Sequence, residues 1–309
     1  MEMLLILVLA IVMDLTIGEP PVAIHPVVWM GKVVSFLVRG GKDRAHLLQF
    51  IIGVGVVLVT IGVFTIPVYL MLSYLNSINP VAYVVVGTLL FKTTFSLRGL
   101  RHSALAIRTL LAKDKLPEAR FELRSLVGRD TASLDKSLMI SAAVESVAEN
   151  TCDSFTAPLF YFLFFGVPGS IAYRAVNTLD AMIGHHGEFE FMGKFAARLD
   201  TMANFIPARI TALLIVLAAW MRKQNASGAW HIMLRDRRKT ESPNAGWTMC
   251  AIAGALGVHL EKVGYYELGD SHNPLTIDTV DISVQLITTA AIVWTLLIIL
   301  AGVIYRVAT

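Results

Sequence analysis

The sequence predicts an all-α integral membrane protein: a multi-helix transmembrane bundle with short and broken helices and a cytoplasmic αα-hairpin. The strongest observation is a run of 47 residues, 45–91, that contains no Asp, Glu, Lys or Arg. Such a run is stable only in hydrocarbon, where helices satisfy the hydrogen bonds of their own backbone. The composition agrees, because 55% of residues are hydrophobic and 16% are charged, against about 25% charged in soluble domains. No segment alternates with the period of a strand, so we expect no β-sheet.

The N-terminal third predicts four helices. The uncharged run divides at the polar turn 76–80 into helices at about 48–75 and 80–91. Two short apolar segments, 3–13 and 26–38, precede the run and flank a Pro-rich break. The first of them lacks the basic n-region of a signal peptide, so we expect it to be retained as an anchoring helix.

The region 92–136 predicts a helical hairpin, because its apolar residues recur every three or four positions in two stripes separated by a turn. We interpret it as a cytoplasmic cap on the membrane domain, with packing as its default role. Further along, 154–173 is uncharged but contains helix-breaking Gly and Pro residues, and 282–305 is long enough to span a bilayer. Before that span, 222–280 predicts a cytoplasmic loop with a small-residue helix at 251–257. The whole chain, 1–309, is predicted to be one membrane-embedded domain.

Basic residues predict the sidedness of the loops in a multi-pass protein of the cell inner membrane. Lysines and arginines, Lys42 and Arg129 among them, gather in 39–44, 92–136 and 222–280. The positive-inside rule therefore places these three regions in the cytoplasm.

This sidedness creates a tension, because two full spans between residues 136 and 222 would put 174–203 outside. We therefore predict that 154–173 and 205–221 are tilted, broken or partly re-entrant. Labelling of a cysteine near Asp180 from the periplasmic side would contradict this prediction.

Three carboxylates, Glu145, Glu149 and Asp153, follow one another at intervals of four residues, which puts them on one face of a helix. Like charges at this spacing repel, and the face lies beside an apolar segment where acids are costly. A divalent cation that prefers oxygen ligands, Mg²⁺, would offset the repulsion and gather phosphates. We prefer this hypothesis to a solvated acidic face, because apolar residues rather than lysines flank the acids.

A second polar group follows within a largely apolar region: Arg174, Asn177, Asp180, Arg198, Asp200, Asn204 and Arg209. The asparagines share helical faces with the aspartates, and the arginines could bind a carboxylate or phosphate through two hydrogen bonds. A structural Arg–Asp pair explains any single pair equally well, but it explains all seven residues less well.

Two further segments carry candidate residues. The first holds Asp14 and His25 among a glycine and prolines that break the helix, as backbone lining a cavity would. His25 is interpreted equally as a base and as a structural hydrogen-bonding residue. The second ends a basic run with Ser242 and Asn244 just before a helix, and free N–H groups at a helix start suit a phosphate.

Several observations argue against other functions. Arg237 and Arg238, taken alone, are best explained as an ordinary positive-inside flank. The net charge is only +3 and no arginine patch is interleaved with aromatics, so nucleic acid is not an expected partner. No P-loop motif occurs, so any nucleotide would bind in another way. Cys152 and Cys250 have no metal-type spacing, and we expect neither a disulfide framework nor a zinc site.

These residues lie in blocks that resemble the cobinamide-phosphate synthase family of cobalamin biosynthesis, the CobD/CbiB-type integral membrane proteins. The blocks are DLTIGEPPVAIHPVVWMG (14–31), VGRDTASLD (127–135), ESVAENTCDSFTAPLFY (145–161), YRAVNTLDAMIG (173–184), ARLDTMANFIPARITALL (197–214) and SPNAGW…AIAGALGV (242–258). They are spread over most of the chain, and ESVAEN with NTLDAMIG and ANFIPAR is specific in combination.

The resemblance implies an ATP- and Mg²⁺-dependent ligase, adenosylcobinamide-phosphate synthase. A propionate of adenosylcobyric acid, a large corrinoid, would be joined through an amide bond to (R)-1-amino-2-propanol O-2-phosphate, or to aminopropanol or a close analogue. Mg²⁺ on Glu145, Glu149 and Asp153 would hold phosphates, and Asp180 or His25 would take a proton from the attacking ammonium. The expected substrate-binding residues are Asp14, Asn150, Arg174, Asn177, Arg198, Asp200, Asn204, Arg209, Ser242 and Asn244, with the arginines neutralising developing charge.

Two other functions stay open. One is another intramembrane Mg²⁺-dependent enzyme with a phosphate-bearing substrate such as a prenyl diphosphate, which a long lipid-chain tunnel would favour. The other is a membrane sensor or transporter of the AmpE-like kind, to which the resemblance extends, although such proteins need not keep the acid face. Besides the lipid bilayer, the sequence leaves open two partners, a second copy of the chain and other cobalamin-assembly enzymes.

Overall fold

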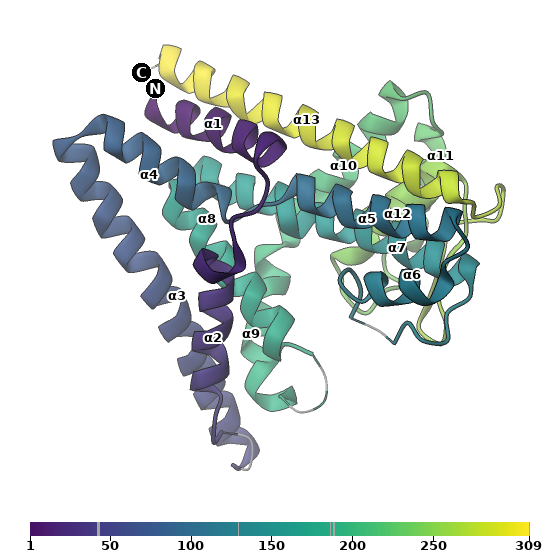
Figure 1. Cartoon of the computed structure of the whole chain (residues 1–309), viewed down its shortest axis with the longest axis horizontal. Coiled ribbons are helices and arrows are strands. Elements are labelled where there is room, and N and C mark those ends of the chain that lie inside the picture. The colour runs from purple at the N-terminus through teal and green to yellow at the C-terminus, as the bar shows by residue number, and fades with distance from the viewer. Residues whose placement is uncertain (42–43, 129, 186, 188, 309) are drawn as a thin grey trace. The chain divides into compact units, whose positions relative to one another are not determined.

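The computed structural model describes residues 1–41, 44–128, 130–185, 187 and 189–308, and there it is almost entirely helical (Figure 1). Four helical stretches in these parts are long and apolar enough to cross a membrane: His46–Ile78, Pro80–Ala112, Lys136–Ile183 and Ile277–Val307. A fifth is present if the bent pair Glu190–Ala203 and Phe205–Met221 counts as one span. The prediction of an all-α, multi-pass membrane protein is therefore confirmed. Lys42 and Arg129, counted above among the basic residues, lie outside the described residues.

The sequence predicted one domain over 1–309, whereas the chain separates into two compact units built from distant segments. The first unit comprises Met1–Ser96, Ala157–Asn204 and Ile299–Thr309, and the second comprises Leu97–Thr156 and Phe205–Ile298. The long helix α13 (Ile277–Ala308) contributes to both.

The first unit holds the helices α1 (Glu2–Thr16), η1 (a 3₁₀ turn, Val22–Ile24), α2 (Pro26–Leu37), α3 (His46–Ile78), α4 (Pro80–Lys92), α8 (Ala157–Ile183) and α9 (Glu190–Ala203). The turn expected at 76–80 lies between α3 and α4, where the Asn79 side chain accepts from the backbone N–H of Val81 and Ala82 at 3.1 Å each. This cap and Pro80 at the first helical position start α4 sharply. The two chain ends lie side by side in Figure 1.

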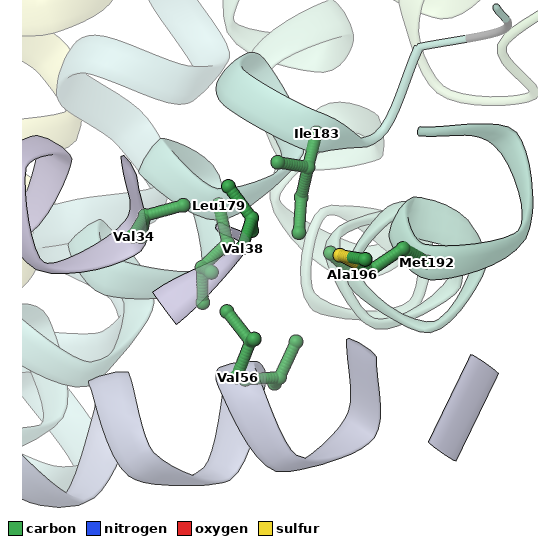
Figure 2. Close-up of a cluster of buried hydrophobic side chains, with 8 residues drawn as sticks. Val34, Val38, Val56, Leu179, Ile183, Met192 and Ala196 are labelled. Atoms are coloured by element: carbon green, nitrogen blue, oxygen red, sulfur yellow. The ribbon is translucent and has the colours of Figure 1, made fainter. Parts of the chain in front are cut away.

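The core of the first unit is apolar and draws on four helices. Figure 2 shows side chains from α2, α3, α8 and α9 pointing toward one another. The cluster consists of Val34, Val38, Val56, Val57, Leu179, Ile183, Met192 and Ala196, each at most 6% exposed. Because lipid tails are as apolar as these side chains, close packing rather than escape from water stabilises the contacts.

Helix α8 bends at Gly166, whose backbone has φ 64° and ψ −160°. A residue with a Cβ is strained at this positive φ, so the glycine is what allows the break. Pro168 lies just beyond it and supplies no backbone N–H to mend the helix. The segment 154–173 is thus broken where its Gly and Pro residues predict.

The second unit holds α5 (Leu97–Ala112), α6 (Leu116–Leu123), α7 (Lys136–Thr151), η2 (a π-helical segment, Cys152–Thr156), α10 (Phe205–Met221), α11 (Ala226–Asp236), α12 (Ala245–Leu256), β1 (Leu260–Lys262) and β2 (Tyr266–Leu268). Helices α5 and α6 lie where the hairpin was expected and pack on each other. The face that α5 buries is the one that its apolar spacing predicts: Leu97, Leu100, Ala104, Ile107 and Leu111.

Two features of the second unit go beyond what the sequence predicted. A sheet exists, because β1 and β2 pair antiparallel with Glu261 opposite Glu267; three residues per strand are too few to give a periodic signal. The segment 222–280 is also more structured than a loop with one short helix. It contains α11 and this hairpin, and α12 begins at Ala245 and ends before Gly257, which is left-handed at φ 63°.

Candidate functional site

Glu145 is held inside the second unit by two hydroxyl groups. It lies on α7, where only 4% of it is exposed. Ser141 donates to Oε1 at 2.6 Å, and Tyr266 of β2 donates to Oε2 at 2.8 Å. Ser141 also accepts from the backbone N–H of Glu261 at 2.8 Å. The β-hairpin, which the sequence did not predict, therefore fixes this carboxylate.

The predicted three-carboxylate metal group is not assembled. Among the described residues, no three His, Cys, Asp or Glu side chains are placed to hold a metal ion together. One physical reason is that hydroxyls engage both oxygens of Glu145. The helix also changes from α to π at Cys152, just before Asp153, so the uniform α-helical spacing on which the prediction rested ends there. Glu149 is exposed and Asp153 is partly buried, which leaves these two more open to a ligand.

Asn150 lies beside these acids and is tied to its own helix. Its amide donates to the carbonyl oxygen of Ser146 at 2.9 Å and to the Ser146 hydroxyl at 2.8 Å. The hydroxyl in turn donates to the carbonyl of Leu126 at 2.6 Å. The donors of the amide thus serve the protein, and a ligand would meet its carbonyl oxygen.

The second predicted group is brought together in part, between α8 and α9 of the first unit. Tyr173 donates to Asn204 Oδ1 at 2.8 Å, and Asn204 donates to Asp200 Oδ2 at 3.0 Å. Asn177 is a further side-chain partner of Asp200, and the charge of Asp180 lies near enough to act on it. Two carboxylates and two amides therefore meet on facing helices.

The two arginines nearest this group differ in position. Arg174 donates to Asn177 Oδ1 at 3.3 Å, so it belongs to the group. Arg198 lies on the exposed face of α9, and it has no ion pair within the described part of the chain.

The seventh predicted member, Arg209, lies in the other unit, at the start of α10. Its Nη1 donates to the carbonyl of Phe205 at 2.6 Å and to Asn244 Oδ1 at 2.7 Å. Asn244 is 7% exposed, so the two predicted substrate-binding residues Arg209 and Asn244 hold each other. Ser242 caps the start of α12, where its hydroxyl oxygen lies 3.3 Å and 3.4 Å from the backbone nitrogens of Asn244 and Ala245.

The end of α1 and the Pro-rich segment after it take part in a buried network of ion pairs. Lys92 at the end of α4 is 1% exposed and lies 3.1 Å from Asp14 and 2.8 Å from Glu19. It also donates to the carbonyl of Phe95 at 3.2 Å, so oxygen atoms of three residues surround the ammonium group. Asp14 is 1% exposed and faces this lysine, so its surroundings give no support to its predicted part in substrate binding, which stays a prediction.

His25 completes the network. Its Nδ1 accepts from the backbone N–H of Val27 at 3.2 Å and so caps α2, which leaves Nε2 to carry the proton toward Glu19 at 3.0 Å. Of the two interpretations of His25, this geometry supports the structural one. Burial raises the pKa of Glu19, but hydrogen bonds from His25, Lys92 and Ser96 outweigh it and lower that pKa to about 2.

Sequence reasoning missed several residues that organise these clusters. Lys92 had a signal, because it is the charge that ends the 47-residue uncharged run. Tyr173 is the last residue of the uncharged segment 154–173, and nothing in the sequence marks its hydroxyl group as a partner of Asn204. Tyr266 gave no signal in the sequence, because its partner Glu145 lies 121 residues away in the chain.

Comparison with known proteins gives further evidence on the family of this chain. The family model described as "CobD/Cbib protein" matches residues 7–305. The "Cobalamin biosynthesis protein CobD" of Dehalococcoides mccartyi is 51% identical over 305 residues, which cover 99% of this chain and 98% of that protein. The "Probable cobalamin biosynthesis protein CobD" of Methanothermobacter thermautotrophicus is 42% identical over 94% and 95% of the two chains, and the "Cobalamin biosynthesis protein CobD" of Photorhabdus laumondii is 34% identical over 91% and 92%. No solved structure matches the chain.

Proposed function

The chain belongs to the CobD/CbiB family and is an enzyme of cobalamin biosynthesis, and from that premise we propose that it is the ligase that makes adenosylcobinamide phosphate. It would join a propionate of adenosylcobyric acid to (R)-1-amino-2-propanol O-2-phosphate through an amide bond. The observation that carries the proposal is the family match along residues 7–305, which includes every polar cluster described above. That match gives no support to a prenyl-diphosphate enzyme or an AmpE-like sensor.

The chemistry needs an activated carboxylate, because a carboxylate and an ammonium do not condense unaided. In the proposed reaction, a propionate oxygen attacks the γ-phosphorus of ATP and ADP leaves. The amine then attacks the acyl carbon, the C–N bond forms, inorganic phosphate leaves, and a base takes the ammonium proton. Asp180 and Asp200 are the proposed proton acceptors, since the two carboxylates lie near each other and Asp200 accepts a hydrogen bond from the amide of Asn204.

The expected magnesium ion fits these residues only with a smaller ligand set. Glu145 is engaged by Ser141 and Tyr266, so we assign it a positioning role toward its own helix. Glu149 and Asp153 are the proposed protein ligands, and one or two carboxylates are usual where phosphates complete the coordination of Mg²⁺. When bound, the ion would offset phosphate charge. The π-helical segment that carries Asp153 supports a site here, because such segments recur at functional positions.

The sidedness of the protein remains part of the proposal. ATP is cytoplasmic, so the basic regions 39–44, 92–136 and 222–280 would face the cytoplasm. Six basic residues at 222–239 support that side for the second unit.

The test is product formation by the purified protein in detergent, supplied with adenosylcobyric acid, aminopropanol phosphate, ATP and Mg²⁺. We expect adenosylcobinamide phosphate from the unmodified protein and loss of at least about a hundredfold in rate from Glu149→Gln, as for removal of a charged group from an active site. Glu118→Gln, the same change at an exposed position of α6, should leave the rate unchanged. If folded protein binds the corrinoid but gives no product, a second protein is required; if it binds no corrinoid, the proposal is wrong.

A further inference from the structure

Two arginines of the second unit share one tryptophan. The guanidinium carbons of Arg209 on α10 and Arg237 after α11 each lie 4.9 Å from the ring centroid of Trp247 on α12. Arg209 also lies 3.7 Å from the ring centroid of Phe205. Aromatic rings attract cations through their faces, so the ring of Trp247 holds two positive groups near each other.

Two basic residues near Arg237 in the chain, Arg235 and Lys239, have carboxylate partners, whereas this pair has none in the described residues. Arg235 lies 2.8 Å from Asp236 and 3.0 Å from Asp270, and Lys239 lies 2.8 Å from Asp236. In the part of the chain that the structure describes, neither Arg209 nor Arg237 forms an ion pair with a carboxylate. The two like charges act on each other, so their proximity costs free energy unless an anion offsets it.

Uncharged hydrogen-bond partners hold Arg209 and Arg237 in place, and, within the parts of the chain that the structure describes, some N–H donors of both side chains stay unused. Arg209 uses Nη1 for Phe205 and Asn244, and Arg237 uses Nη1 for the carbonyl of Leu234. An arginine has five N–H donors in a planar fork, and within the described residues the Nε and Nη2 groups of both side chains have no acceptor. Both side chains are partly exposed, so a ligand in water can reach these donors.

Backbone packing fixes Arg237 against the start of α12. At Gly246 an added Cβ would collide with the carbonyl oxygen of Arg237, so only glycine lets the start of α12 approach this close. Trp247 follows at once, and Ser242 caps the same helix start with its exposed hydroxyl. The arrangement is therefore built by the fold and is more than a flexible basic flank.

We propose that Arg209 and Arg237, held by Trp247, bind the phosphate group of a phosphorylated co-substrate of the ligase. The inference rests on the proposed function and deepens it. A phosphate dianion matches two guanidinium forks in charge and geometry better than a carboxylate does, because it offers three terminal oxygens. Two co-substrates carry such a group, the phosphorylated amino alcohol and ATP. For the first, the pair would distinguish aminopropanol phosphate from aminopropanol.

The test compares Arg237→Gln with Arg238→Gln, which removes a charge from the adjacent exposed residue. The KM for aminopropanol phosphate is expected to rise about tenfold or more in Arg237→Gln, as loss of a charge-assisted contact would cause, while kcat changes little. The KM for unphosphorylated aminopropanol should stay the same. A rise in the KM for ATP instead would support the phosphate site with ATP as its ligand. Equal effects of the two variants, equal shifts for aminopropanol and its phosphate, or no shift in any KM would overturn the proposal.

A binding measurement separates this proposal from the ligase assignment. Titration with inorganic phosphate and with the phosphorylated co-substrate, aminopropanol phosphate or ATP, should change the fluorescence of Trp247, whereas aminopropanol should not. The change should vanish in Trp247→Phe. Phosphate binding without amide formation would leave the site standing and remove the ligase assignment. Amide formation with no fluorescence response and no KM shift would support the ligase assignment and rule out the phosphate site.

Discussion

The two charged clusters of this protein differ in whether their charges are matched. In the first unit, Lys92 is 1% exposed, forms ion pairs with Asp14 and Glu19, and donates to the carbonyl of Phe95. In the second unit, Arg209 and Arg237 share Trp247 and have no carboxylate partner in the described parts of the chain. A buried charge that is fully paired organises the fold, whereas a partly exposed charge without a counter-ion is available to a ligand.

The difference also corrects how the two segments are interpreted from sequence. Asp14 and His25 lie in an unusual Gly- and Pro-rich setting, and that setting suggested a site. Arg237 lies in a basic run beside an apolar helix, and that position suggested an ordinary flank. We propose the opposite assignments, because we base them on the partner of each charge and not on its neighbours in the chain.

Removal of Lys92 tests the matched cluster and should give the largest effect. Lys92→Met leaves Asp14 buried without its cation, and breaking a buried pair from one side costs about 3–5 kcal/mol. We expect the detergent-solubilised variant to unfold at a much lower temperature or to aggregate. Lys32→Met, at an exposed position of α2, should behave like the unmodified protein.

A double variant refines this prediction. Asp14→Asn combined with Lys92→Met removes both charges and should recover part of the lost stability. If the single and double variants are equally unstable, the ion pair is not the reason for the loss.

Asp236 is itself paired but lies beside Arg237, for which the described residues hold no carboxylate partner. Removal of the Asp236 charge should have an intermediate effect on stability. Its fully buried carboxylate accepts from Arg235 at 2.8 Å and from the backbone N–H of Gly269 at 3.0 Å. Burial raises its pKa, but the hydrogen bonds from Arg235 and Lys239 outweigh it and hold that pKa well below the usual range. Asp236→Asn should lower stability by about 1.5–3 kcal/mol, the contribution of a hydrogen bond to a charged group.

The same variant should not weaken phosphate binding, because it removes a negative charge near Arg237 instead of a donor to the ligand. Thermal unfolding and the KM for aminopropanol phosphate measure the two effects separately. A rise in KM as large as that of Arg237→Gln would contradict the distinction between structural and binding arginines.

The fold could be predicted from sequence as far as its signals are local. The uncharged run gives α3 and α4 with the turn at Asn79, and Gly166 with Pro168 marks the break in α8. The π-helical segment and the β-hairpin could not be predicted, because neither gives a periodic signal in the sequence. The hairpin is held by the bond between Ser141 and Glu261, which are 120 residues apart.

The candidate site could be predicted only in part, for the same reason. Spacing of four residues placed Glu145, Glu149 and Asp153 on one face on the assumption of a continuous α-helix, and the helix changes type at Cys152. By contrast, Asp200 and Asn204 are joined by a 3.0 Å hydrogen bond, because that pair lies four residues apart within reach of a single helix. Periodicity is reliable within one helix and gives no information about the partner from another.

The smallest expected effect is the acid response of the matched cluster, and it follows from Glu19. Hydrogen bonds from His25, Lys92 and Ser96 outweigh burial and lower the pKa of Glu19 from 4.5 to about 2. The folded protein therefore binds fewer protons than the unfolded chain between these values, so the contribution of Glu19 is complete above pH 4.5 and is lost as the pH falls toward about 2. At neutral pH the unmodified protein should have a higher free energy of unfolding than Glu19→Gln. This difference in stability should become smaller as the pH falls below about 4.5. The Arg209–Arg237 cluster has no such carboxylate, so Arg237→Gln should not change how stability depends on pH in acid. If Arg237→Gln changes this pH dependence and Glu19→Gln does not, the two clusters are assigned the wrong way round.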